Sequence, residues 1–164
     1  MPGIRLHPNY HGYTLTDPAL AVLLRLAAAR GLFVQLAVLM EDERMMHPLI
    51  RVPPVDLAPL HRLVREIPHL RLILLNALGA LRADALRPIM EAAKVYLEIS
   101  MLEGVGGVGR ILQDLPVDRI LFGSHSPLFY FESAALKLKE SPLTADQLKC
   151  IRSHNAQELV GGRT

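Results

Sequence analysis

Polar residues that could carry acid–base or metal chemistry follow several of the short apolar runs in this sequence. His7 follows the first run, Asn76 follows a run near the middle, and His125 follows the last one. An imidazole can bind a metal ion or transfer a proton near neutral pH, and an amide offers both a donor and an acceptor. The sequence therefore predicts that His7, Asn76 and His125 are the catalytic residues of one site.

A second set of polar residues lies a few positions beyond the ends of these runs. His11 comes four residues after His7, and Glu41 and Arg44 follow the second apolar run. Charged and hydrogen-bonding groups in such connections suit the rim of a pocket that takes a small polar molecule. We predict that Glu41, Arg44 and His11 bind the substrate.

These residues need a scaffold that brings the ends of the apolar runs together. The runs are typical of buried strands, and the amphipathic segments between them are typical of helices. This alternation predicts an α/β fold with about five parallel strands, either as an open doubly wound sheet or as part of an eight-stranded barrel. Ligands bind at the carboxyl ends of the strands in both architectures. The predicted strands cover 4–7, 32–38, 70–75, 94–100 and 119–123, and the predicted helices cover 17–30, 56–67, 82–93, 108–115 and 129–139, with a last one opening at Thr144.

Two helix starts carry their own signals. Asp17 is a capping residue type, and Pro18 then stands at the first helical position. Thr144 and Gln147 have the spacing of a capping box. Pro88 lies inside its predicted helix and is expected to bend it.

Composition restricts the class of protein. The chain has 164 residues, of which 51% are hydrophobic, and this predicts a single globular domain over residues 1–164. Its single cysteine, Cys150, excludes an internal disulfide framework and suits the cytoplasm. No apolar run is long enough for a membrane span, so we expect no membrane association. The 18 basic and 16 acidic residues are interspersed, which argues against nucleic-acid binding.

Other motifs are weaker. Residues 104–109 fit the glycine spacing of a dinucleotide-binding loop, but the next predicted strand does not end in an acidic residue that could bind a ribose. The segment 123–127 lacks the pattern of a serine nucleophile elbow. Cys150 occupies an amphipathic helical position and is expected to pack rather than react.

Five segments of the chain carry a resemblance when they are taken in order: 3–13, 31–34, 72–76, 120–127 and 155–159. They resemble the carboxyl-terminal half of the amidohydrolase-related family, a group of metal-dependent hydrolases and decarboxylases built on a TIM barrel. The resemblance implies that this chain carries the fourth to eighth strands of such a barrel. It also implies that an amino-terminal half is missing or is supplied by another chain. Because five strands cannot close a barrel, we expect a homo-oligomer or association with that half.

The resemblance also shows three departures at the positions where the family places metal ligands. Ala37 and Asn76 stand where the family has histidines, and His125 stands where it has an aspartate in a G-S-D-x-P pattern. A divalent metal is implied by the family, but its usual ligands are absent here, so we expect the metal centre to be lost or rebuilt and leave the cofactor unknown.

Two functions follow from the resemblance. The first is hydrolysis or decarboxylation of a small acid, amide or lactone at a degenerate metal site. The alternative is a non-catalytic relative that binds a small ligand or a partner. A nucleotide-binding protein is a third possibility that depends on residues 104–109 alone.

Overall fold

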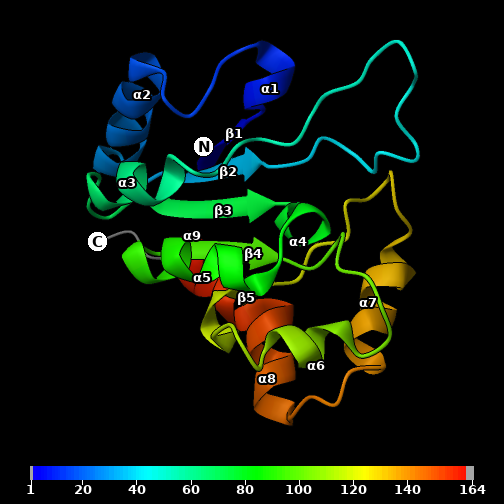
Figure 1. Ribbon diagram of the computed structural model, residues 1–164. Helices are drawn as coiled ribbons and strands as arrows, with labels where there is room; N and C mark the ends of the chain where they lie inside the picture. The colour runs from blue at the N-terminus through cyan, green and yellow to red at the C-terminus, as the bar shows by residue number, and fades with distance from the viewer. Residues whose placement is uncertain (1, 162–164) are drawn as a thin grey trace.

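One sheet of five parallel strands organises the molecule (Figure 1). The computed structural model describes residues 2–161. Neighbouring strands pair in sequence order, so each crossover joins adjacent strands. The predicted parallel sheet is therefore confirmed. The strands are β1 (Gly3–Leu6), β2 (Phe33–Ala37), β3 (Arg71–Leu75), β4 (Val95–Glu98) and β5 (Ile120–Leu121).

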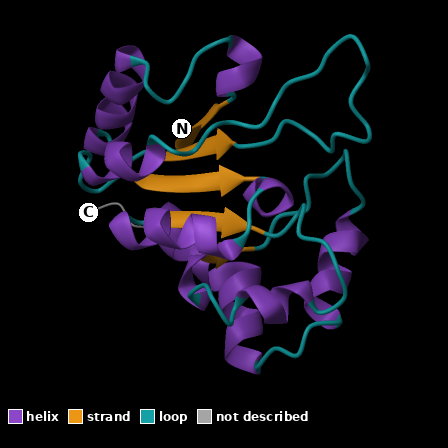
Figure 2. Ribbon diagram, in the orientation of Figure 1, coloured by secondary structure: helices purple, strands orange, loops and turns teal. Residues whose placement is uncertain are grey.

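Helices flank the sheet and connect its strands (Figure 2). Several helices are shorter than the sequence predicts. The elements before β5 are α1 (Pro8–His11), α2 (Pro18–Ala29), α3 (Leu60–Arg65), α4 (Ala77–Ala80), α5 (Ala83–Ala92), α6 (Gly107–Ile111) and the 3-10 turn η1 (Val117–Arg119). Those after β5 are α7 (Phe131–Lys139), α8 (Ala145–Lys149), the π-helical η2 (Cys150–His154) and α9 (Asn155–Gly161).

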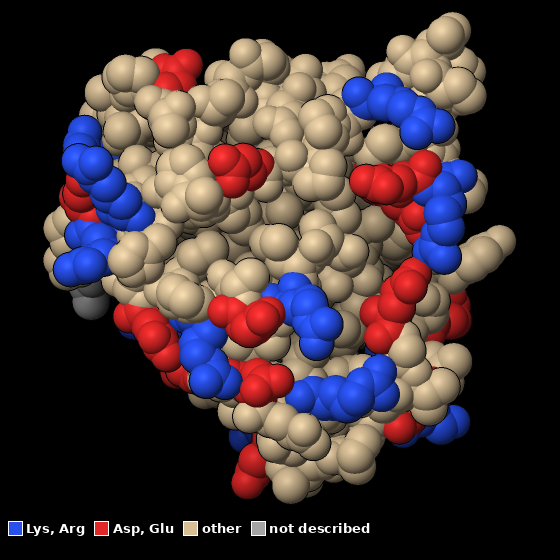
Figure 3. All heavy atoms as spheres, in the orientation of Figure 1, with Lys and Arg blue, Asp and Glu red and all other residues tan. Residues whose placement is uncertain are grey.

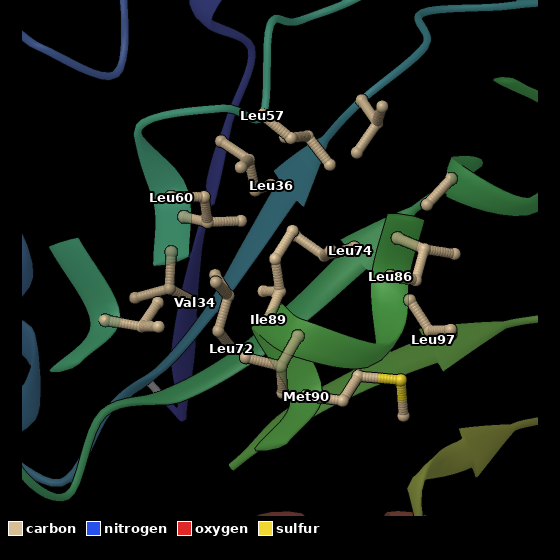
Figure 4. Close-up of a cluster of buried hydrophobic side chains, with 14 of the residues drawn as sticks. Val34, Leu36, Leu57, Leu60, Leu72, Leu74, Leu86, Ile89, Met90 and Leu97 are labelled. Carbon is tan, nitrogen blue, oxygen red and sulfur yellow. The ribbon is translucent and has the colours of Figure 1, made fainter. Parts of the chain in front are cut away.

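The larger hydrophobic core lies between one face of the sheet and the connecting helices. Val34, Leu72 and Leu97 project from successive strands into this core and are almost completely buried. Figure 4 shows them facing side chains such as Leu60 of α3 and Leu86 of α5. Side chains alternate between the two faces of a strand, so the intervening strand residues must point to the opposite face.

The opposite face of the sheet has a smaller core. Ile73, Tyr96 and Leu121 project from this face and pack against Leu159 of α9. The C-terminal helix thus covers part of the face that the larger core does not use. Glu98 lies on the same face of β4 as Tyr96 because the two residues are two positions apart.

The predicted helix starts are confirmed at two places. The Asp17 carboxylate accepts a hydrogen bond from the backbone N–H of Ala19 at 2.8 Å. Thr144 and Gln147 form both hydrogen bonds of the capping box. Pro88 does lie inside α5.

Two predicted helices need correction, and two short helices were not predicted. The helix predicted from Asp56 begins only at Leu60, because Pro59 disfavours helical backbone at the residue before it. Asp56 instead accepts a hydrogen bond from the N–H of Ala58 in the preceding turn. The helices α1 and α4 are too short to show a periodic pattern and were not predicted. The final helix is interrupted by the π-helical turn η2.

None of the helices formed within residues 2–161 is long and apolar enough to span a membrane.

Candidate functional site

The three residues predicted to be catalytic all lie at the carboxyl ends of strands. His7 follows β1, Asn76 follows β3, and His125 lies in the connection after β5. Because the strands are parallel, these positions share one edge of the sheet. However, β1 and β5 are the two outer strands. Four interstrand spacings of about 4.8 Å separate such strands by roughly 19 Å along a sheet, less if it curves. A single cleft that unites His7 with His125 stays a prediction.

A buried carboxylate at the end of β4 organises the β3–β5 half of this edge. Glu98 is only 6% exposed. Its Oε1 accepts a hydrogen bond from the backbone N–H of Asn76, and its Oε2 accepts one from the backbone N–H of Ser100, both at 2.6 Å. Buried charge is costly unless it is hydrogen-bonded in this way. Glu98 therefore fixes the backbone where both β3 and β4 end.

Asn76 extends this network to β2. Its backbone is left-handed, with φ of 60°, a conformation that asparagine tolerates better than most residues. Its side-chain amide donates to the Leu39 carbonyl at 2.9 Å and accepts from the Ser100 hydroxyl at 3.0 Å. The residue is 2% exposed. Both ends of the amide are thus engaged, which favours a positioning role for Asn76 over direct contact with a ligand.

Gly123 brings the end of β5 against the same carboxylate. A side chain at this position would collide with Glu98, because an added Cβ would lie 2.9 Å from the Glu98 Cβ and closer still to Oε2. Only glycine fits between the end of β5 and Glu98. The glycine of the G-S-H segment is therefore required by packing against β4.

His125 has a polar atom without a partner. Its Nε2 is buried and makes no hydrogen bond with any residue that the structure describes. The backbone at His125 is left-handed, with φ of 53°, and its ring centroid lies 5.4 Å from that of Phe129. An imidazole nitrogen of this kind can hydrogen-bond to a ligand or transfer a proton.

At the other end of the edge, His7 lies beside β2. Its Nδ1 is 3.0 Å from the Met40 sulfur, and its ring meets that of His11 edge-on at 6.1 Å between centroids. Burial, aided by the positive charge of Arg5 and by His11, holds the pKa of His7 below its ordinary value. His7 is thus favoured as a neutral imidazole near neutral pH. His11 is exposed and stacks on Tyr13.

The long connection after β2 carries two of the three predicted substrate-binding residues, Glu41 and Arg44, whereas His11 ends α1 after β1. Arg44 forms ion pairs of 2.6 Å with Asp42 in the same connection and with Glu103 after β4. These hydrogen bonds raise the pKa of Arg44 and lower that of Asp42. Figure 3 shows such mixing of charge, with basic and acidic side chains interspersed over the face in view. Glu41 is half-buried in the same connection.

Beside this ion pair is a cavity of about 1000 Å³. Arg44 and Glu103 line it together with Ser100 and Lys137. Of the six residues predicted to form the site, Arg44 alone belongs to its lining; His7, His11, Glu41, Asn76 and His125 lie outside it. Ser100 connects the cavity to the Glu98 network, because it lines the cavity and its backbone N–H donates to Glu98.

Ala37, Asn76 and His125 stand at the positions where the resemblance places metal ligands. From residue 2 to residue 161, no three or more His, Cys, Asp or Glu side chains are grouped so that they could hold a metal ion. Ala37 is buried at the end of β2 and offers only a methyl group. The amide of Asn76 is already hydrogen-bonded at both ends.

The glycine-rich loop folds around one of its own neighbours. Arg110 donates a hydrogen bond to the carbonyl of Val105. A Cβ added to Gly104 would lie 2.6 Å from an Arg110 nitrogen. The arginine thus occupies the space that the glycine leaves open, and this arrangement gives no support to a dinucleotide site.

Two polar residues of this region were not predicted. Glu98 lies inside the apolar run 94–100, whose other charged residue, Lys94, stands at its start, and a charge inside a buried strand is a signal that could have identified Glu98. Lys137 lies on α7, where a lysine on an amphipathic helix gives no comparable signal.

A comparison with protein-family models finds that the family described as Amidohydrolase matches residues 1–162. Among curated proteins, none matches the sequence.

Solved structures share this fold at low sequence identity. A 5-carboxyvanillate decarboxylase from Sphingomonas paucimobilis has a TM-score of 0.73 and 12% identity, and the match covers 98% of this chain and 58% of that one. A TIM-barrel protein from Bordetella bronchiseptica has a TM-score of 0.72 and 16% identity, with 96% and 57% covered. Amidohydrolase 2 from Bifidobacterium longum subsp. infantis has a TM-score of 0.68 and 21% identity, with 98% and 61% covered.

The chain therefore spans about three fifths of the length of these structures. Its five parallel strands and flanking helices correspond to part of a TIM barrel, as the sequence predicts. The family match covers nearly every residue. This chain belongs to the amidohydrolase family.

Proposed function

We propose that the chain forms the carboxyl-terminal part of a hydrolase or decarboxylase that acts on a small acid, amide or lactone. The observation that carries this proposal is the pairing of a rigid network with an imidazole whose buried Nε2 has no hydrogen-bond partner among the described residues. Glu98 fixes the ends of β3 and β4 and packs against Gly123, two residues before His125. The Nε2 of His125 has no partner among the described residues.

His125 is the residue to which we assign proton transfer. Its imidazole could take a proton from water, or deliver one to a leaving group or to the carbon that loses carbon dioxide. His7 is the second predicted catalytic residue, and Asn76 positions the backbone between them. Arg44, with Glu41 and His11, would contact the substrate at the rim.

We also propose that the usual metal centre of the family is degenerate in this chain. Ala37 lacks a ligating atom, and Asn76 and His125 replace residue types with different charge and reach. The proposed roles of His125 and His7 therefore involve no metal-bound step.

Turnover of a panel of small carboxylic acids, amides and lactones tests the proposal, with metal content measured on the same sample. We expect His125→Ala to lower turnover about a hundredfold or more, as is typical for loss of a general acid or base. Its unfolding midpoint should stay close to that of the wild type. His154→Ala is the matched control, because His154 is an exposed histidine within η2 and is not one of the proposed site residues. Equal turnover in wild type and His125→Ala would contradict the assignment.

The replacement of the family's ligand types at Ala37, Asn76 and His125 favours a second candidate, a non-catalytic relative that binds a small ligand or partner. This reading predicts binding without turnover, even when divalent metal is added. Turnover that depends on added metal would contradict both this alternative and the proposed degenerate centre.

We further propose that the chain associates through its open sheet edges, either with a second copy or with an amino-terminal half. In the described sheet, β1 and β5 each pair with one neighbour only. Unpaired edges recruit further strands. Apolar side chains such as Leu49 and Tyr130 are also more than 80% exposed. Light scattering is expected to show self-association that rises with concentration, and a monomer over a wide range would contradict it.

A further inference from the structure

The cavity beside Arg44 has the size and walls of a small-molecule site. Its volume of about 1000 Å³ lies at the upper end of the range for such pockets, about 300–1,000 Å³. It lies between the connections after β2 and β4, the helix α4 and the helix α7. Apolar side chains including Leu39, Leu81, Met101 and Phe129 form much of its lining.

One cation within the cavity lacks a counter-ion. Lys137 is half-buried, and its ammonium donates hydrogen bonds to the carbonyls of Ile99, at 3.1 Å, and of Ser100. An ammonium group has three N–H donors, so these two bonds leave one unused. Across the described residues, no carboxylate lies within ion-pair distance of Lys137. Glu98, Glu103 and Glu140 affect it only from farther away.

The environment of this ammonium favours an anion. Burial is the largest influence on Lys137 and lowers its pKa, so its charge is incompletely compensated. Charges taken out of water need a partner, and a carboxylate that binds an ammonium forms a charge-assisted hydrogen bond. Ser133 lies one helical turn before Lys137 and also lines the cavity, where its hydroxyl could donate a second bond.

The mouth of the cavity limits which anion would enter. Its lining carries the exposed Glu43, Glu103 and Glu140 and the half-buried Asp42, and Asp42 and Glu103 share the single cation Arg44. The mouth is thus net negative, and a second carboxylate on the ligand would be repelled there. The apolar lining instead suits an uncharged hydrocarbon or aromatic body.

We propose that this cavity binds a monocarboxylic acid with an apolar body, whose carboxylate pairs with the Lys137 ammonium. His125 and His7 lie outside the lining, so the ligand would not contact the two histidines proposed to be catalytic, and of the predicted site residues Arg44 alone is shared. Binding can therefore be present whether or not the chain has any turnover.

The first test uses the full chain and four related probes in an NMR titration. Benzoate is expected to bind and to shift the amide signals of Ser100, Phe129 and Ser133. Benzamide should bind at least tenfold more weakly because it lacks the charge, isophthalate should be weaker because of its second carboxylate, and benzylamine should not bind. Benzamide as tight as benzoate, benzylamine binding more tightly than benzoate, or no benzoate shifts at these residues would each overturn the proposal.

Variants of α7 provide the second test. Lys137→Met should weaken benzoate binding at least tenfold, while Lys137→Arg keeps a cation and should retain more of it. Lys139→Met is the matched control, because Lys139 is exposed on the same helix and lies outside the cavity lining. Unchanged benzoate affinity in a folded Lys137→Met protein would refute the assignment. If that variant does not fold, the Lys137→Arg variant and the four-probe series on the wild type still decide the outcome.

Discussion

The two halves of the sheet's carboxyl edge are held together in different ways. At the β3–β5 half, a buried carboxylate bonds directly to the backbone of two strand ends and packs against a third at Gly123. At the β1–β2 half, apart from the buried hydrogen bond from Asn76 to the Leu39 carbonyl, the corresponding ties are made by side chains with access to water. Asn9 donates to the carbonyls of Pro53 and Pro54, and Arg44 reaches across to Glu103.

This difference indicates which half can hold reacting groups in place and which can adapt to a ligand. Hydrogen bonds to a buried charge are strong because no water competes for the partners. Exposed ion pairs are weakened by water and by salt. The backbone next to the Glu98 network, including the segment that carries His125, is therefore held in place. The connection after β2 can change position at little cost in free energy.

The largest expected effect comes from neutralising the carboxylate itself. Glu98→Gln keeps the shape of the side chain but turns one acceptor into an N–H donor that faces a backbone N–H. We expect a loss of about 3 kcal/mol in the free energy of unfolding, the upper range for a hydrogen bond to a charged group. Urea denaturation measures it, with Glu91→Gln on the exposed side of α5 as control. Equal losses of unfolding free energy in the two variants would mean that the Glu98 network does not distinguish the β3–β5 half of the edge from the β1–β2 half.

The close packing of β5 against Glu98 gives the next effect. Gly123→Ala places a methyl group where Glu98 lies, and the carboxylate cannot move without breaking its two bonds. Overpacking of this kind costs about 1–3 kcal/mol. Gly161→Ala is the control, because a Cβ there meets no atom of residues 2–161 within 4 Å. The thermal unfolding midpoints of the two variants should differ by several degrees. Coinciding unfolding curves would show that the Glu98 carboxylate can move aside without loss of stability.

Sequence reasoning could predict the scaffold better than the site. The alternation of apolar runs predicted the parallel sheet, and Asp17 and Thr144 marked helix starts correctly, because these signals are local. The network was missed because Glu98 lies inside a run that otherwise favours a buried strand. Lys137 was missed because the carbonyls that it binds lie 37 and 38 residues away. Strand order, which separates His7 from His125, depends on the whole fold and cannot be inferred from either residue alone.

A smaller effect is expected at the β1 end, where pH should act through His7. Its pKa is below the ordinary 6.5 in the folded chain, so the unfolded chain takes up the proton first as pH falls. Stability should therefore be greatest above pH 6.5 and should decline as pH falls toward the lower pKa of the folded state. In His7→Gln this part of the pH dependence should disappear, whereas the exposed His47→Gln should retain it. Unfolding midpoints measured from pH 7.5 to 5 give the comparison, and parallel slopes in wild type and His7→Gln would contradict it.

The smallest effect on stability is expected from Arg44→Gln, although this change should alter the connection after β2 the most. Arg44 and Glu103 are both largely exposed, at 72% and 73% of their side chains, so water and salt already screen the pair. The unfolding midpoint should stay within error of the wild type. Cleavage by thermolysin near Leu49 and Ile50 should be faster, because the ion pair between this connection and the loop after β4 is lost.

Glu103→Gln should be cleaved at the same rate as Arg44→Gln, and the double variant should be cleaved no faster than either single variant. The cleavage rate of the wild type in 1 M salt should approach that of Arg44→Gln. Arg62→Gln removes another exposed pair, with Glu66 on α3, and should leave the cleavage rate unchanged. If Arg44→Gln instead lowered the midpoint as much as Glu98→Gln does, the two halves of the edge would be equally rigid.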